Sequence, residues 1–279
     1  NTIAVEKIHP ISSVYLAAQC QALEKDLLPK AIKIGLLPEP NTLRWLARHI
    51  QKLRLNQKIF CVWDPVLKAS TGARFLDAFD RGEIDPLLKQ VDLITPNLQE
   101  AEVLTKIRIK SFDDITLAAK QLLDRGVKSV LIKGGHTFDQ DMSDNTSFCR
   151  DYFVSSDTEF WLSHRRQEQP NNHGTGCTLA SAIACFVAQE HSLSDSIVLA
   201  NRFIQQGLRL AAPQGQGAGP VWQSPLEHHP EDLSELTKTT ESFLYSAPTP
   251  PFPQTSSLGI YAIVDHVEEA ERLIKQGVD

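Results

Sequence analysis

The chain has 279 residues, of which 42% are hydrophobic, and its 28 Lys and Arg against 34 Asp and Glu give a formal net charge of −6. This length and hydrophobic content suffice for one large α/β domain or two smaller ones with packed cores. No stretch concentrates Lys and Arg, which argues against nucleic acid as a partner. No apolar run reaches the roughly 18 to 20 residues that cross a bilayer, and the N-terminus has no signal segment, so we expect a cytoplasmic protein without a membrane partner.

Short β-branched apolar runs alternate with longer stretches of helical periodicity from residue 31 onward, which is typical of a parallel sheet with crossover helices. Four such runs are predicted strands, at 31–37, 58–63, 91–95 and 129–133. Two closely spaced runs, at 151–154 and 159–164, predict a hairpin.

Helices are predicted from capping residues and from apolar residues that recur at intervals of three and four residues. Asn41 is the expected N-cap of the first, and Ser111 begins a capping box for a second helix that ends at Gly126. Two more helices are predicted after Gly176 and from Ser194 onward.

The composition changes after Ala212. A polar segment at 231–244 has helical character, and the proline-rich segment 246–257 is typical of a stiff linker. Beyond it, LGIYAIVD at 258–265 predicts a strand, followed by a helix. We therefore expect a first domain at 1–225, a linker at 226–257 and one βα unit at 258–279.

Polar side chains follow three successive predicted strands at the point where each strand ends. They are Asp64, Asn97 with Glu100, and Lys133. The carboxyl ends of parallel strands meet at one edge, where ligands bind beside helix N-termini, so these residues are placed to hold a metal-nucleotide. Each also has a purely structural interpretation. Asp64 would cap a turn, and Asn97 would form an Asx-turn. Glu100 would be an acid in the first turn of a helix, and Lys133 would be a solvated charge.

The segment NNHGTGCTLASAIA at 171–184 is the strongest local feature. Gly174 and Gly176 flank Thr175 where a helix begins, so backbone N–H groups can converge there on an anion such as a transferring phosphoryl group. The same helix N-terminus is expected to lower the pKa of Cys177. The structural alternative is an ordinary tight turn. The other four of the five cysteines are widely spaced, without C-x-x-C, and are interpreted as small apolar residues.

HGTGCTLASAIA at 173–184 resembles the signature of hydroxymethylpyrimidine/phosphomethylpyrimidine kinases, which belong to the ribokinase-like superfamily. Further blocks are similar in order and spacing over roughly residues 1–225: KIGLL at 33–37, DPVLKASTG at 64–72, TPNLQEAEVL at 95–104, LIKGGH at 131–136 and GAGPV at 217–221. The resemblance implies a three-layer α/β/α fold with a mostly parallel sheet. It also implies ATP- and Mg²⁺-dependent phosphorylation of hydroxymethylpyrimidine and its monophosphate in thiamine biosynthesis.

The resemblance also implies roles on the nucleotide side. Asp64, Asn97 and Glu100 would organise the magnesium and the nucleotide phosphates, with the metal at Asp64 and Glu100. Lys133 would lie near the ATP phosphates and His136 on the nucleotide side.

On the acceptor side, the resemblance makes the turn at 174–176 the anion hole around the γ-phosphate and Cys177 the base. Leu36 and Val66 match positions that line the pyrimidine pocket. The chain departs from the family at 70–72, where Ser-Thr-Gly stands in place of a Lys-Ser pair before the glycine. It also lacks the family's first strand and glycine-rich stretch before Asn1, so we expect the sheet to lack a central strand.

Residues 258–279 resemble the opening of thiamine phosphate synthase, a TIM barrel, which implies a bifunctional protein. Two alternatives stay open. One is a pyridoxal or pyridoxine kinase of the same fold, and the other is a non-catalytic fragment with a residual ATP site. The expected partner is a small-molecule pyrimidine, and a homodimer is left open.

Overall fold

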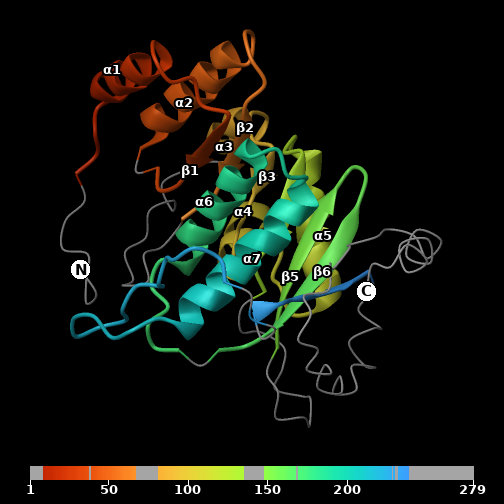
Figure 1. The fold of residues 1–279 in the computed structure, drawn as a ribbon. Coiled ribbons are helices and arrows are strands. Elements are labelled where there is room, and N and C mark those ends of the chain that lie inside the picture. The colour runs from red at the N-terminus through yellow and green to blue at the C-terminus, as the bar shows by residue number, and fades with distance from the viewer. Residues whose placement is uncertain are drawn as a thin grey trace, which may run out of the picture. The chain divides into compact units, whose positions relative to one another are not determined.

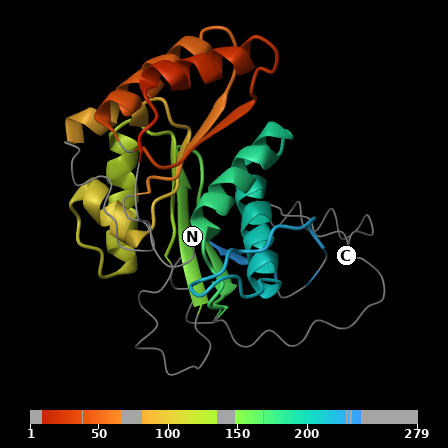
Figure 2. The same cartoon turned by 90° about the vertical axis from the view of Figure 1, so that its left-hand side faces the viewer.

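The computed structural model describes residues 9–37, 39–66, 81–134, 148–167, 169–227, 229 and 232–238. These residues form a seven-stranded sheet with helices on both faces, as Figures 1 and 2 show. The strands are β1 (Ala31–Ile34), β2 (Phe60–Trp63), β3 (Leu93–Ile94), β4 (Ser129–Ile132), β5 (Phe148–Ser155), β6 (Glu159–Arg165) and β7 (Glu235–Thr237). The helices are α1 (Ser13–Glu24), α2 (Pro40–Leu53), α3 (Arg81–Leu88), α4 (Leu98–Thr105), α5 (Phe112–Asp124), α6 (Thr175–Ala188) and α7 (Leu193–Arg209).

The strands follow one another across the sheet in chain order. β1 to β4 are parallel, and β5, β6 and β7 each pair antiparallel with the strand before them. β6 therefore runs in the direction of β1 to β4, so most strands point the same way. The predicted three-layer α/β/α class with a mostly parallel sheet and a hairpin is confirmed, while the predicted TIM-barrel unit at 258–279 lies outside the described residues.

The apolar core positions α6 over the sheet. Val62, Leu93, Leu131 and Phe153, one from each of β2 to β5, are buried in one cluster with residues of α6 and α7. Figure 2 shows α6 and α7 on this face and α2 to α5 on the other. α6 packs on β1 and β2, and its first turn lies beside Asp64 and Lys133, which follow β2 and β4, so the N-terminus of α6 lies at the carboxyl edge of the parallel strands.

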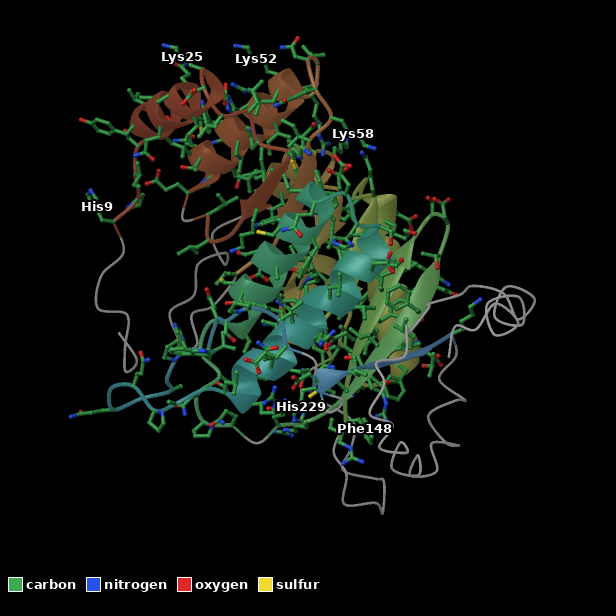
Figure 3. All side chains as sticks on the ribbon, viewed as in Figure 1. His9, Lys25, Lys52, Lys58, Phe148 and His229 are labelled. Atoms are coloured by element: carbon green, nitrogen blue, oxygen red, sulfur yellow. The ribbon has the colours of Figure 1, made fainter. Side chains whose placement is uncertain are left out.

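Labelled residues in Figure 3 mark the two ends of the parallel strands, which form the carboxyl edge and the opposite edge of the sheet. Phe148 begins β5, which is antiparallel to β4, so it marks the edge at which the parallel strands end. Lys58 precedes β2 and marks the opposite edge. Of the helices that the structure describes, none combines the length and the hydropathy of a membrane-spanning segment.

Three local predictions are corrected by the structure. Asn41 is not the cap of α2, because Pro40 occupies the first helical position, where its fixed φ favours a start one residue earlier, and Glu39 is the N-cap. The helix predicted from Ser194 begins at Leu193, with the Ser192 side chain accepting from the backbone of the first turn. The polar segment at 231–244 contains a strand, β7, at its described residues.

β7 also bears on the division of the chain. It adds to the sheet beyond residue 225, and the first compact unit extends to Thr240. Within the predicted linker, the Asp232 side chain is completely buried and accepts hydrogen bonds from Arg209 of α7 at 3.1 and 2.8 Å. The linker that the composition predicts at 226–257 therefore includes residues that pack as part of the sheet domain.

Candidate active site

An ion pair joins two of the predicted strand-end residues. Asp64 follows β2, and Lys133 follows β4. The Lys133 ammonium donates to Asp64 Oδ1 at 2.8 Å, and the Thr95 hydroxyl donates to the same oxygen at 3.3 Å. Only 2% of Asp64 is exposed, so this carboxylate needs such partners. The structure thus brings together side chains that sequence reasoning placed at one edge of the sheet.

The charge of Lys133 is stabilised by its surroundings. Burial alone would lower the pKa of its ammonium group, but the carboxylates of Asp64 and Glu100, with a smaller contribution from Asp151, more than offset this effect and raise the pKa. Lys133 therefore stays a cation at neutral pH and remains available to attract a phosphate.

Asn97 and Glu100 form a reciprocal capping box at the start of α4. Asn97 Oδ1 accepts from the Glu100 backbone N–H at 2.8 Å, and Glu100 Oε2 accepts from the Asn97 backbone N–H at 2.7 Å. The structural interpretation of Glu100 as an acid in the first turn of a helix is confirmed, whereas Asn97 is the N-cap of α4 and not the predicted Asx-turn. Their position still belongs to the site, because Asn97 pairs with Lys133 in a parallel bridge and the Glu100 carboxylate acts on the Lys133 charge.

The N-terminus of α6 lies directly above the Lys133–Asp64 ion pair. A Cβ atom placed on Gly176 would be 3.1 Å from Lys133 Nζ and 3.7 Å from Asp64 Oδ2. Gly174 is the N-cap with φ of 83°, a left-handed conformation that favours glycine, and it offers no capping side chain. The Thr175 N–H donates to Asn172 O at 3.5 Å. Helix geometry leaves the next N–H groups of the first turn, those of Gly176 and Cys177, without intrahelical acceptors at this site.

The turn before α6 is held by a segment that is distant in sequence. The His173 backbone N–H donates to Gly219 O at 3.0 Å, and Val221 N–H donates to His173 O at 3.0 Å. Asn171, which is buried, accepts from the Gly219 N–H through its side chain at 3.2 Å. The blocks at 171–177 and 217–221 therefore meet in space, and the second fixes the first.

The expectation that Cys177 has a lowered pKa is wrong. Partial burial of the thiol raises its pKa, and so does the Asp64 carboxylate, with which the thiol is also hydrogen-bonded. The cations of Lys33 and Lys133 act in the opposite direction without reversing the shift. The helix N-terminus was the only influence visible in the sequence, whereas the nearby carboxylate depends on the fold.

The remaining predicted residues are placed as follows. Leu36 lies two residues beyond β1 with 40% of its surface exposed, and Val66 lies three residues beyond β2 and is half-buried. Both are therefore at the carboxyl edge, beside the strands nearest α6. His136 lies outside the described residues, as does the departure from the family pattern at 70–72.

Two polar residues of the site escaped sequence reasoning. Thr95, at the end of β3, is completely buried and donates to Asp64. Asp151 of β5 is buried, accepts from the Gly134 N–H at 2.9 Å and has a raised pKa because of its burial. Gly134 has to be glycine, because a Cβ there would lie 1.8 Å from Arg150 O. An Asp directly before the apolar run 152–154 of β5 was the available signal for Asp151.

The donor set is compatible with Mg²⁺. Among the described residues, no group of three or more His, Cys, Asp or Glu could hold a metal ion. Mg²⁺ is commonly bound through one or two carboxylates together with substrate phosphates, so a dedicated protein cage is not required. Asp64 and Glu100 supply hard oxygen donors, and both carboxylates act on Lys133.

Comparison with known proteins is consistent with this geometry. The sequence matches the family described as phosphomethylpyrimidine kinase over residues 1–222. It is 36% identical to the thiamine biosynthesis bifunctional protein ThiED of Geobacter sulfurreducens over 229 residues, which cover 79% of this chain and 43% of that protein. It is 30% identical to the hydroxymethylpyrimidine/phosphomethylpyrimidine kinase of Staphylococcus aureus over 223 residues, 79% of this chain and 78% of that protein.

A solved structure matches the fold. The pyridoxal kinase of Staphylococcus aureus in complex with AMP-PCP superposes with a TM-score of 0.70 at 25% sequence identity, covering 84% of this chain and 81% of that chain. Against ThiED, in contrast, the chain spans less than half of the relative's length.

Proposed function

This chain belongs to the phosphomethylpyrimidine kinase family, and from that premise we propose that it transfers the γ-phosphoryl group of ATP to hydroxymethylpyrimidine and then to its monophosphate. The observation that carries the proposal is the position of Gly176 over the Lys133–Asp64 ion pair, at the N-terminus of α6. A helix N-terminus and a buried, charged lysine together make a site for a phosphate.

We propose the following roles for the side chains. Lys133 binds phosphate oxygens of the nucleotide, and Asp64 and Glu100 hold Mg²⁺, which when bound would neutralise charge on those oxygens. Backbone N–H groups of the α6 first turn orient the phosphoryl group and stabilise the charge on its oxygens. Phosphoryl transfer needs little covalent help from the protein, so positioning and charge stabilisation supply most of the catalysis.

Cys177 has a role only in the first transfer. The hydroxymethyl acceptor is an alcohol and must lose a proton as its oxygen attacks, so a base is useful there. The monophosphate is already ionised at pH 7 and needs none. Because the pKa of the Cys177 thiol is raised, it becomes a base only after losing its own proton, so only a small fraction of it is thiolate at neutral pH.

The experiment that tests the proposal is turnover of ATP with hydroxymethylpyrimidine, its monophosphate and pyridoxal as competing acceptors. Pyridoxal is the relevant competitor, because the superposed kinase is described as a pyridoxal kinase. Preferential turnover of pyridoxal would replace the proposed substrate with that of a pyridoxal kinase. If calorimetry detects no binding of Mg²⁺-ATP, the chain is instead a non-catalytic fragment.

We also propose that this kinase is part of a bifunctional protein. The motivation is the likeness to ThiED together with the sequence pattern at 258–279, which stays a prediction. The division at 1–225, 226–257 and 258–279 also stays a prediction, with β7 added to the sheet of the first domain. A (β/α)₈ barrel takes about 250 residues, so 22 residues cannot form one alone. Extension of the chain by the downstream reading frame should add coupling of the pyrimidine diphosphate to the thiazole phosphate. A stop codon after Asp279 would refute this part.

A cytoplasmic location and a homodimeric assembly complete the proposal. Cell fractionation tests the first, and sedimentation analysis tests the second.

A further inference from the structure

Lys33 occupies an unusual position in β1. Ala31, two residues earlier, packs against the apolar cluster beneath α6 and α7, and residues two apart in a strand share a face. The parallel partner of Lys33 is Val62, which is fully buried in that cluster. A lysine therefore stands on the α6 face of the sheet, at a position whose neighbours are apolar.

The side chain of Lys33 extends toward the candidate site. Its Nζ lies 2.8 Å from the point where a Cβ on Gly35 would be, so the chain runs along β1 toward the carboxyl edge. Burial and Asp64 dominate the environment of the Cys177 thiol, but the positive charge of Lys33 is also felt there. Lys33 thus reaches the first turn of α6 from the side of β1.

Lys33 has no counter-ion within the part of the chain that the structure describes. Lys133, by contrast, is paired with Asp64 at 2.8 Å. A half-buried ammonium group without a carboxylate is costly, because it has lost part of its hydration without gaining a partner. Such a cation is a site for an anionic group of a ligand.

The two lysines come from different parts of the sheet edge. Lys133 follows β4 and Lys33 belongs to β1, and strands three places apart are separated by about 14 Å. Leu36 and Val66, the residues expected to contact the acceptor ring, follow β1 and β2. Lys33 is therefore on the acceptor side, whereas Lys133 is on the nucleotide side.

We propose that Lys33 binds the phosphate group of the phosphorylated acceptor and so determines whether the second transfer occurs. The inference rests on the proposed function. In the second transfer, an oxygen of the acceptor phosphate bonds to the γ-phosphorus as the bond between that phosphorus and the ADP oxygen breaks. The products are ADP and the acceptor diphosphate. The acceptor phosphate carries close to two negative charges at pH 7, which the alcohol acceptor lacks.

The test compares the two acceptors in Lys33→Met and Lys33→Arg variants. Lys33→Met should lower kcat/KM for the monophosphate by about 10- to 100-fold, mainly through KM, the range for loss of a charged hydrogen bond. Its kcat/KM for the alcohol should fall less than that for the monophosphate, because the alcohol has no phosphate to lose and Lys33 acts on that step only through its charge near the Cys177 thiol. Lys33→Arg should recover much of the monophosphate activity, since it restores the charge. Lys58→Met, at the opposite edge of the sheet, is the matched control and should change neither step.

Equal losses with both acceptors, or no loss with either, would overturn the inference while leaving the proposed function intact. A wild-type chain that phosphorylates neither acceptor would overturn both. Thermal unfolding shows whether Lys33→Met folds, and if it does not, Lys33→Gln replaces it in the same comparison.

Discussion

Gly176→Ala should separate the stability of the fold from the function of the site. Gly176 lies in the first turn of α6 with an ordinary helical conformation, so alanine fits its backbone. The reduced freedom of the unfolded chain favours alanine by about 0.4 to 1 kcal/mol. For a domain of this size, that sets an upper limit of roughly 4 °C on the rise in Tm, because the new Cβ also displaces Lys133 Nζ, 3.1 Å away.

The same methyl group should reduce activity. It would lie 3.1 Å from Lys133 Nζ, closer than most Cβ contacts, and 3.7 Å from Asp64 Oδ2. It therefore occupies the space between the ion pair and the helix N-terminus, where we place the phosphoryl group. We expect kcat/KM to fall by about 10²-fold or more with both acceptors, the size of losing one preorganised donor.

Gly174→Ala is the comparison for stability, because Gly174 itself belongs to the turn proposed as the anion hole. A Cβ on Gly174 meets nothing within 4 Å, but φ of 83° makes alanine strained. This variant should therefore lose about 1 to 2 kcal/mol of stability while adding nothing to the phosphate site. Thermal unfolding measures the stability of both variants, and steady-state kinetics measures their kcat/KM. Full activity in a folded Gly176→Ala protein would refute the placement of the phosphoryl group between the ion pair and the N-terminus of α6.

Three further predictions follow from the contacts of the site and of the sheet edge. Because the pKa of Cys177 is raised, its thiolate fraction grows as pH increases, so kcat for the alcohol should rise through the alkaline range while kcat for the monophosphate stays flat. Matching pH profiles would exclude Cys177 as the base. In Glu100→Gln, the amide oxygen should still accept from the Asn97 N–H, so the Tm of the protein should not change. The variant should need more Mg²⁺ to reach its half-maximal rate. An unchanged Mg²⁺ titration would show that Glu100 does not bind the metal. Arg209→Met leaves the buried Asp232 carboxylate uncompensated and should cost about 3 to 5 kcal/mol in urea unfolding, whereas a negligible loss would show that this segment is not integral to the fold.

The sequence could predict the edge of the sheet because that edge follows from local patterns alone. Parallel strands must end at the same side, so Asp64 and Lys133, each directly after an apolar run, had to lie near one another. Two glycines around Thr175 before an apolar helix predict an anion site at its N-terminus, and this stays a prediction. Neither inference needed any knowledge of which helix covers which strand.

Other features depend on contacts that no local pattern encodes. The segment that contains β7 is polar and short, and its propensity favoured a helix, but the exposed edge of β6 offers backbone partners to Leu236 and its neighbours. The raised pKa of Cys177 required α6 to pack beside β2, which brings Asp64 to the thiol. The sequence alone did not single out Lys33, because a lysine in a strand is usually a solvated charge. Only its register with Val62 places it on the face of the sheet that α6 and α7 cover.

The two lysines differ in whether a carboxylate lies close to the ammonium group. A buried cation and a buried anion stabilise one another only when they are close, and Asp64 does this for Lys133. A phosphate and the Asp64 carboxylate therefore compete for the Lys133 ammonium group. A divalent cation bound to Asp64 would neutralise that carboxylate and leave Lys133 to the phosphate. Nucleotide and metal should accordingly bind together. Lys33 has no such carboxylate among the described residues, so an acceptor phosphate can bind there without displacing an ion pair. In the proposed site, the nucleotide phosphates would therefore depend on the metal, whereas the acceptor phosphate would bind independently at Lys33.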